Sequence, residues 1–99
     1  MIVHSDVWGP SRVKTLARYR WFITFIDCFS QTTWVYSMTH KSEVGHCFKS
    51  FHKMVITQFN TKIQVLRSDN GLEYKDTAFQ HYLQDQGIIH QTSYVDTPT

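Results

Sequence analysis

The stretch VLRSDNGLEY, residues 65–74, places an acidic residue directly after a run that is typical of a buried β-strand. The run is apolar and β-branched, and the Asn70-Gly71 pair that follows Asp69 predicts a tight turn. A carboxylate at the end of a buried strand costs free energy unless a partner holds it there. Two roles meet that requirement: an Asx-turn, in which the carboxylate caps its own turn, or the binding of a cation.

Strand signals on both sides of this stretch predict one small α/β domain. Apolar, aromatic and β-branched residues predict strands over 2–7, 21–27, 32–38, 63–68 and 88–92. Gly9-Pro10 is expected to end the first strand, and a basic connection over 11–20 follows it. The element order is therefore strand, strand, strand, helix, strand, helix, strand.

Two helices separate the later strands. The first carries an apolar stripe at helical spacing, formed by Val44, Phe48, Phe51 and Val55. Ser42 is predicted as its N-cap and Asn60 as its end. The second helix is predicted to begin at Asp76 or Thr77 and to be closed by Gly87.

The connections predict how the strands pair. Short links between the first three strands favour an antiparallel meander, whereas a helix before each of the last two favours parallel pairing. If the strand over 63–68 lies beside the first strand, Asp6 and Asp69 come close together. Two like charges at one site raise each other's pKa unless a cation neutralises them. This arrangement is a hint of a divalent metal site.

Composition limits the chain to a single domain over residues 1–99. Hydrophobic residues make up 41% of the 99 residues, which suits a globular core. The net charge of +2 does not by itself indicate a nucleic-acid partner. Cys28 and Cys47 are predicted to be reduced, buried thiols, and neither a signal peptide nor a membrane span is expected. The turn-like DTPT at residues 96–99 suggests a piece cut from something longer.

Several blocks of the sequence, in the same order and spacing, resemble the catalytic core of a retroelement integrase, and most closely that of copia-type LTR retrotransposons. The blocks are HSDVWGP (4–10), RWFITFIDCFSQTTWVY (20–36), HKSEV (40–44), VLRSDNG (65–71) and HQTSYVDTP (90–98). The resemblance implies a ribonuclease H-like fold: a five-stranded mixed sheet with helices, incomplete at its C-terminal end. It also implies an activity that joins element DNA to target DNA.

By this resemblance, Asp6 and Asp69 are two of three catalytic carboxylates that bind Mg²⁺ or Mn²⁺. Hard carboxylate oxygens suit these ions, and paired ions assist both attack and departure at a phosphodiester. The third carboxylate is expected as a Glu about 35 residues beyond Asp69, which falls past Thr99. Glu73 is interpreted as a turn or substrate-side residue. The set is therefore incomplete, and the fragment is predicted to be inactive alone.

Positive residues suggest where DNA phosphates are contacted. Arg12, Lys14, Arg18, Arg20 and Lys75 are the candidates, because phosphate contact needs only positive charge within reach. The alternative is a solvated loop with no ligand. A stacking role on bases is left open for Trp8, whereas Trp21 and Trp34 are expected in the core.

These features favour one of three functions. The first is a fragment of a metal-dependent polynucleotidyl transferase core whose partners are element ends and target DNA, and which forms homo-oligomers in the full-length protein. The second is a non-catalytic nucleic-acid-binding remnant of a decayed element, favoured by departures such as Leu72, where the family often has Gly. The third is a ribonuclease H-type nuclease. The first places the protein in the nucleus, with a cytoplasmic phase and no membrane association.

Overall fold

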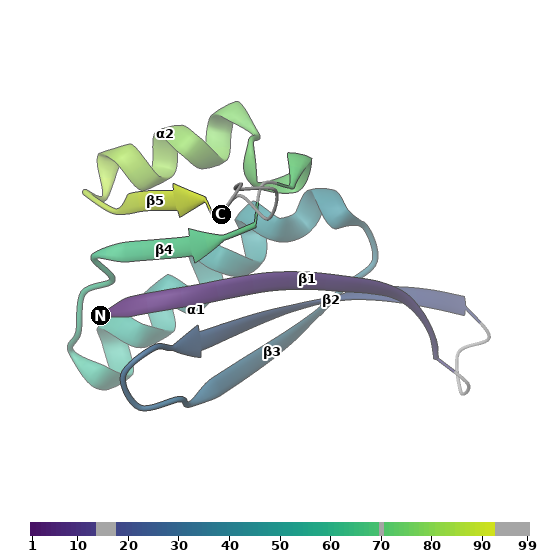
Figure 1. Ribbon diagram of the computed structural model, residues 1–99, viewed down its shortest axis with the longest axis horizontal. Coiled ribbons are helices and arrows are strands. Elements are labelled where there is room, and N and C mark those ends of the chain that lie inside the picture. Colours follow the sequence, from purple (N-terminus) through teal and green to yellow (C-terminus); the bar gives the residue numbers. More distant parts are fainter. Residues whose placement is uncertain (14–17, 70, 93–99) are drawn as a thin grey trace, which may run out of the picture.

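Five strands form one mixed sheet in the order β3-β2-β1-β4-β5 (Figure 1). The computed structural model describes residues 1–13, 18–69 and 71–92, and it describes no side chains at 11–13, 18–19 and 72. The strands are β1 (Ile2–Val13), β2 (Arg18–Asp27), β3 (Thr33–Met38), β4 (Val65–Ser68) and β5 (Ile89–Thr92). The predicted element order is confirmed.

Strand pairing follows the predicted topology. β1 pairs antiparallel with β2, and β2 pairs antiparallel with β3. β4 pairs parallel with β1 on one side and with β5 on the other. The strand that precedes Asp69 therefore does lie beside the strand that carries Asp6.

The first strand is longer than predicted. β1 continues through Gly9-Pro10 to Val13 and pairs with a β2 that begins at Arg18, so the expected loop over 11–20 is largely a two-stranded ribbon. The register shifts between Trp8 and Ser11. An irregularity of this kind accommodates a proline, which has no N–H to give to a ladder, without ending the strand.

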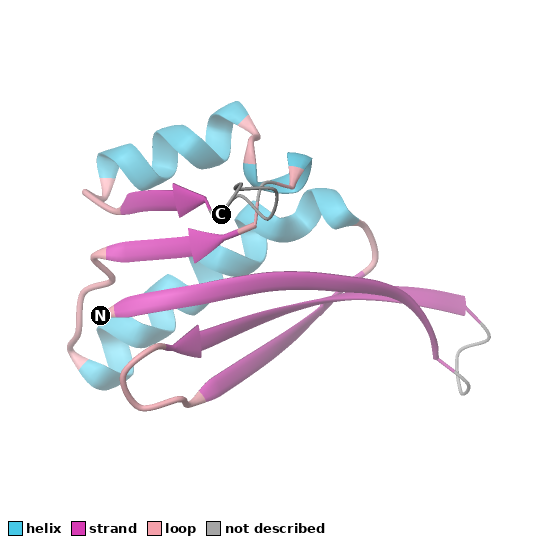
Figure 2. Cartoon of the chain, in the orientation of Figure 1, coloured by secondary structure: helices cyan, strands magenta, loops and turns pink. Residues whose placement is uncertain are grey.

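Two helices contact the same face of the sheet (Figure 2). α1 (Val44–Phe59) follows a 3₁₀ turn, η2 (Lys41–Glu43), so Ser42 lies inside that turn and the prediction of Ser42 as N-cap was wrong. The Glu43 carboxylate instead accepts a hydrogen bond from the His40 backbone N–H at 2.7 Å. Asn60 ends the helix in the left-handed conformation, at φ 51°, as predicted.

The second helix, α2 (Thr77–Asp85), begins as its sequence predicts. The Asp76 side chain accepts a hydrogen bond from the Phe79 N–H at 3.0 Å, which makes Asp76 the N-cap. A second 3₁₀ turn, η3 (Leu72–Tyr74), lies between β4 and this helix. Gly87 adopts φ 70°, which turns the chain back into β5 without the strain that a side chain would add.

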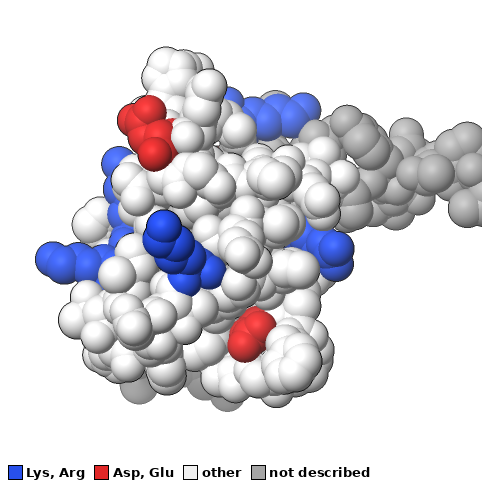
Figure 3. All heavy atoms as spheres, turned by 90° about the vertical axis from the view of Figure 1, so that its left-hand side faces the viewer, with Lys and Arg blue, Asp and Glu red and all other residues white. Residues whose placement is uncertain are grey.

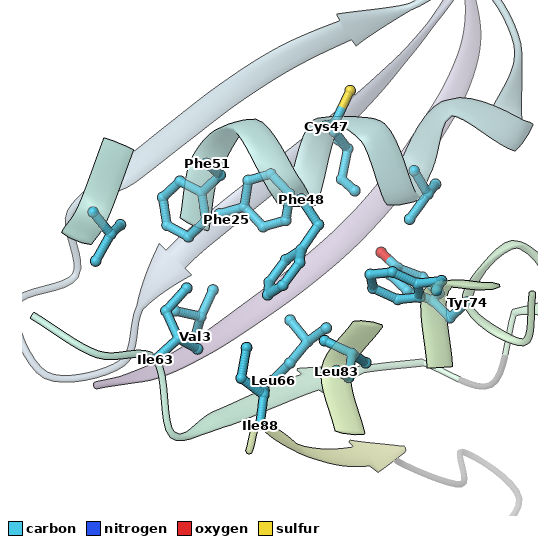
Figure 4. Close-up of a cluster of buried hydrophobic side chains, with 14 of the residues drawn as sticks. Val3, Phe25, Cys47, Phe48, Phe51, Ile63, Leu66, Tyr74, Leu83 and Ile88 are labelled. Atoms are coloured by element: carbon cyan, nitrogen blue, oxygen red, sulfur yellow. The ribbon is translucent and has the colours of Figure 1, made fainter. Parts of the chain in front are cut away.

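Aromatic side chains from the sheet and from α1 fill the core (Figure 4). Phe25 of β2 stacks on Phe51 of α1 with ring centroids 4.4 Å apart, and Phe48 meets Phe25 edge-on at 5.9 Å. Phe79 of α2 packs against Phe48 at 5.5 Å, so one cluster joins both helices to the sheet. These contacts bury one face of the sheet and leave the other exposed.

Two further expectations were tested by the fold. Cys28 and Cys47 form no disulfide, as predicted, although only Cys47 is buried. Burial raises the pKa of the Cys47 thiol, which keeps it protonated and unreactive at neutral pH. Within the described ranges, neither helix has the length and apolar character needed to cross a membrane.

Truncation of a buried phenylalanine tests this packing. Phe25→Ala removes a ring that is fully buried, and we expect it to lower the free energy of unfolding by about 3–5 kcal/mol in urea titrations. Phe29→Ala is the matched control, because Phe29 is 96% exposed and its loss should change stability by less than about 0.5 kcal/mol. Equal losses in the two variants would contradict the assigned core.

Candidate functional site

The parallel ladder between β1 and β4 brings the two predicted acids to one end of the sheet. It pairs Ile2 with Val65, Val3 with Leu66 and His4 with Arg67. Continued by two residues, the same register sets Asp6 beside Asp69, which directly follows β4. Asp6 lies on the sheet face opposite the helices, since Val3, three positions away on β1, is buried against them. The alternation of β4, continued by one residue, directs Asp69 to the same face.

The Asp69 carboxylate also closes its own turn. Its Oδ1 accepts a hydrogen bond from the Gly71 N–H at 3.1 Å, and its carbonyl accepts one from the Ser68 hydroxyl at 3.0 Å. This is the Asx-turn that the Asp-Asn-Gly sequence predicts. A carboxylate has two oxygens, so the turn fixes the direction of Asp69 without excluding a cation.

A buried tyrosine connects the strand of Asp6 to the loop of Asp69. The Tyr74 hydroxyl lies 2.9 Å from the Ser5 hydroxyl, and both residues are fully buried. Burial raises the pKa of Tyr74, and the nearby negative charges of Asp69, Asp6 and Glu73 raise it further, whereas the Ser5 hydrogen bond lowers it. Tyr74 is therefore a neutral hydrogen-bonding group, and it lies close enough to both acids to respond to their charges.

A second, partly buried chain of hydrogen bonds supports Asp69 from β5. His90 Nε2 lies 2.7 Å from the Ser68 hydroxyl, and Gln80 Nε2 lies 3.0 Å from His90 Nδ1. Because Ser68 donates its proton to the Asp69 carbonyl, it accepts from His90, so the imidazole carries its proton on Nε2. Gln80 donates to Nδ1 and also to the Tyr74 carbonyl at 2.5 Å. Burial lowers the pKa of His90, which favours this neutral form.

Glu73 is engaged in an ion pair. Its Oε2 lies 3.5 Å from Lys41 Nζ, and Lys41 in turn lies 4.7 Å from the centre of the Trp21 ring. The carboxylate folds back over Gly71, where an added Cβ would approach Glu73 Oε1 to 2.8 Å. A side chain at residue 71 would therefore displace the Glu73 carboxylate from this position. The ion pair gives Glu73 a role in fixing the turn, in line with its interpretation from sequence.

Only part of the predicted basic set can be placed. Arg20 is partly buried and donates from Nη1 to the Thr39 hydroxyl at 3.3 Å, and Lys75 is exposed beyond η3. Arg12 and Arg18 lie on the β1–β2 ribbon, but their side chains, and the whole of Lys14, lie outside the described residues. On the side of the molecule in Figure 3, Lys and Arg are scattered rather than gathered into one patch.

The donor set fits a hard divalent cation in part. Asp6 is exposed and Asp69 half-buried, so both carboxylates are accessible on the open face of the sheet. Mg²⁺ is commonly held by one or two carboxylates together with water and substrate phosphate oxygens. Among the described residues, no group of three or more His, Cys, Asp or Glu side chains is arranged to hold a metal ion. At any one place, the described residues therefore offer at most two ligands of these four types.

Sequence reasoning did not single out the polar residues that support the acids. None of Ser5, Ser68, Tyr74 and Gln80 is predicted from sequence, and His90 is expected only as a packing or hydrogen-bonding residue of the last strand. One signal was available: each acid is preceded by a serine, in HSD and in RSD, at an inward-facing position where an apolar residue is the rule. A buried serine implies a hydrogen-bond partner, although its identity depends on the fold.

Comparison with known proteins gives these features a family. The model of the family described as "Integrase core domain" matches residues 2–98. The chain belongs to the integrase core domain family. The resemblance to copia-type integrases drawn from sequence blocks is thereby confirmed.

The relatives of this integrase core are long polyproteins. The "Retrovirus-related Pol polyprotein from transposon TNT 1-94" of Nicotiana tabacum is 38% identical over 97 residues, which are 98% of this chain and 7% of the relative. That from transposon RE2 of Arabidopsis thaliana is 38% identical over 96 residues, 97% of this chain and 6% of the relative. The chain thus spans less than a tenth of the length of these relatives.

Solved structures confirm the ribonuclease H-like fold of this integrase core. The HTLV-2 integrase catalytic core domain in complex with magnesium, in a trimeric form, superposes with a TM-score of 0.71 at 20% identity, over 93% of this chain and 58% of that one. A chain of the simian T-cell lymphotropic virus intasome in complex with PP2A regulatory subunit B56 gamma superposes with a TM-score of 0.75 at 20% identity, over 95% of this chain and 32% of that one.

The His90 chain predicts a pH dependence of stability. His90 has a lowered pKa in the folded state and an ordinary value of 6.5 when unfolded, so the unfolded chain binds more protons in the window below pH 6.5. The contribution of His90 to the free energy of unfolding is therefore fully present above pH 6.5 and declines as the pH falls towards the pKa of the folded state. We expect His90→Gln to lose less stability than the parent between pH 7.5 and 5.5 in urea unfolding.

The matched control for this measurement is His81→Gln. His81 is exposed on α2, so its replacement should leave the pH profile of the parent unchanged. His52, whose pKa is also lowered by burial, is present in all three proteins and cancels in the comparison. A His90→Gln profile that overlays the parent's would contradict the neutral, hydrogen-bonded assignment.

Proposed function

We propose that this chain is part of the catalytic core of a retroelement integrase, which cleaves and joins DNA strands with the help of divalent metal ions. The observation that carries the proposal is the parallel register of β1 and β4, which directs Asp6 and Asp69 to one end of the sheet. Membership of the integrase core domain family supports it independently. The proposal concerns the full-length protein, of which these residues form a small part.

In the proposed chemistry, Asp6 and Asp69 hold Mg²⁺ or Mn²⁺ through carboxylate oxygens. Such ions, when bound, stabilise negative charge on the oxygens of a phosphodiester undergoing in-line displacement. Residues of the chain supply orientation. The Asx-turn fixes Asp69, the Ser5–Tyr74 hydrogen bond ties its loop to β1, and the Ser68–His90 hydrogen bond ties it to β5. Ligands held in this way keep their geometry when substrate binds.

A second candidate function is a non-catalytic nucleic-acid-binding remnant. It is favoured by departures from the family's sequence such as Leu72, where the family often has Gly. The two candidates differ in metal dependence. A remnant that binds nucleic acid through positive charge alone binds more weakly when Mg²⁺ is added, because the ion competes for the phosphates, whereas an integrase core that holds the ion binds DNA more tightly with Mg²⁺.

The partners that we propose are the DNA ends of the element and a target DNA, and the setting is the nucleus, with a cytoplasmic phase. Homo-oligomerisation of the full-length protein belongs to the same proposal. It is supported by analogy with the HTLV-2 integrase core, whose structures are described as trimeric and dimeric forms. The simian viral relative is described in an intasome.

Titration with Mn²⁺ tests the metal ligands directly. We expect Asp6→Asn and Asp69→Asn each to weaken Mn²⁺ binding to the 99-residue chain by about tenfold or more, because each removes a charged ligand and changes little in shape. Isothermal calorimetry or electron paramagnetic resonance measures the affinity. Asp85→Asn removes the same charge from an exposed position on α2, and Glu73→Gln removes it from the Lys41 ion pair. Both controls should bind Mn²⁺ as the parent does.

A result in which all four variants bind Mn²⁺ equally would refute the assignment of Asp6 and Asp69. A loss confined to Glu73→Gln would transfer the ligand role to that residue. The folded state of each variant is checked by its thermal unfolding, since removing one of two neighbouring like charges should not destabilise the domain.

Strand joining by the 99-residue chain is expected to be absent. Two of the three carboxylates that the family implies are present, and in-line displacement without the complete set lacks part of its charge stabilisation. The measurement is Mg²⁺-dependent joining of a labelled oligonucleotide to a target duplex. Joining above the level of a metal-free control would overturn this expectation.

A further inference from the structure

A row of polar side chains crosses the open face of the sheet just before the acids. His4 pairs with Arg67 in the β1–β4 ladder, and Arg67 pairs with Gln91 in the β4–β5 ladder, so the three side chains stand side by side. The preceding row on this face is Ile2, Val65 and Ile89, in the same register. Asp6 and Asp69 continue the pattern one row further on, about 6.6 Å away.

This polar row forms part of a surface groove. His4, Arg67, Gln91 and Thr92 line a hollow of about 360 Å³. A volume near the lower limit of small-ligand sites is enough for a phosphate group and part of its sugar, but not for a large apolar ligand. The groove lies beside the acids and on the same face, so one DNA strand can reach both.

The Arg67 side chain is held in an orientation that suits a phosphate. Its Nε donates to Gln91 Oε1 at 3.1 Å, which uses one edge of the guanidinium and fixes the plane of the group. Among the described residues, the ion pair is between Lys41 and Glu73, so no described carboxylate neutralises Arg67. A planar, oriented guanidinium binds phosphate oxygens through two parallel N–H donors, which a lysine cannot do.

We propose that His4, Arg67 and Gln91 form a subsite for a backbone phosphate of the DNA strand that is bound at Asp6 and Asp69. The proposal rests on the proposed function and adds to it the position of a neighbouring phosphate. Arg67 supplies the charge, Gln91 holds the guanidinium plane, and His4 completes the wall of the groove on β1. None of the three belongs to the basic set that sequence analysis selected.

The alternative is a structural one, in which Arg67 and Gln91 form a solvated cross-strand pair. Such pairs contribute about 0.2–1 kcal/mol to a sheet and need no ligand. The two alternatives differ in their response to DNA. A structural pair leaves DNA affinity and its salt dependence unchanged when Arg67 is replaced, whereas a phosphate subsite does not.

The test uses the 99-residue chain and a single-stranded oligothymidylate, with affinity followed by NMR titration at several salt concentrations and with saturating Mg²⁺. We expect Arg67→Ala to weaken binding about tenfold and to lower the slope of log K against log salt by about 0.7, the value for one phosphate contact on a single strand. Arg67→Lys keeps the charge but loses the planar fork, so it should weaken binding about threefold with the slope retained.

Lys53→Ala is the matched control. Lys53 is exposed on α1, which covers the other face of the sheet, so its loss removes the same charge away from the groove. Equal effects of Arg67→Ala and Lys53→Ala on affinity and slope would overturn the subsite. A second titration with inorganic phosphate separates the two sources of the anion. Binding of phosphate at Arg67 without Arg67-dependent binding of the oligonucleotide would overturn the DNA assignment.

The magnesium dependence separates failure of the subsite from failure of the proposed function. If Asp69→Asn abolishes the effect of Mg²⁺ but Arg67→Ala changes nothing, the metal site stands and the subsite is wrong. If Arg67→Ala has the expected effect but Mg²⁺ has none in any protein, the subsite stands and the metal site is wrong. Thermal unfolding of Arg67→Ala checks the fold, which the loss of one exposed side chain should leave intact.

Discussion

The parallel pairing of β1 with β4 is the constraint on which the rest of the structure depends. It joins the antiparallel meander of β1, β2 and β3 to the parallel pair of β4 and β5. The two parts are connected through three paired positions. Everything at the candidate site follows from its register. A shift by one residue would turn Asp69 and Arg67 towards the helices and bring Ser68 out to solvent. The buried residues on both strands oppose that shift, because Val3 and Leu66 are fully enclosed by the core.

Polar ties on the buried side reinforce the same register. Ser5 and Ser68 occupy inward positions next to Asp6 and Asp69. Ser5 is hydrogen-bonded to Tyr74 and Ser68 to His90, both of which are distant in sequence. Burying a hydroxyl is unfavourable unless it is paired, so any register that separates these partners loses stability. The exposed face thus carries the two acids, while the enclosed face fixes their alignment. Gln80 links these two pairs, because its amide donates hydrogen bonds to both His90 and the Tyr74 carbonyl.

Local patterns in the sequence were sufficient to predict element order and strand pairing, and with them that Asp6 and Asp69 lie towards the same end of the sheet. They worked because apolar alternation, the Asp76 cap and the Asn60 terminus act within a few residues. The prediction that Gly9-Pro10 ends the first strand was wrong, because a register shift inside β1 accommodates the proline. The prediction of Ser42 as N-cap was wrong because a 3₁₀ turn precedes the helix. Contacts such as Lys41–Glu73 and Gln80–His90 join residues of different elements, so no local sequence pattern predicts them. The groove at Arg67 was not predicted because it depends on the register of three strands at once.

The length of β1 has a consequence for how the molecule opens. Its first residues lie between β2 and β4, whereas Ser11–Val13 pair with β2 alone, and in Figure 1 this ribbon extends beyond the rest of the sheet. A two-stranded ribbon is marginally stable by itself. Amide protection should therefore be graded along a single strand, strongest near Val3 and weakest towards Val13. The outer ribbon can fray and re-form while the inner half keeps the acids aligned.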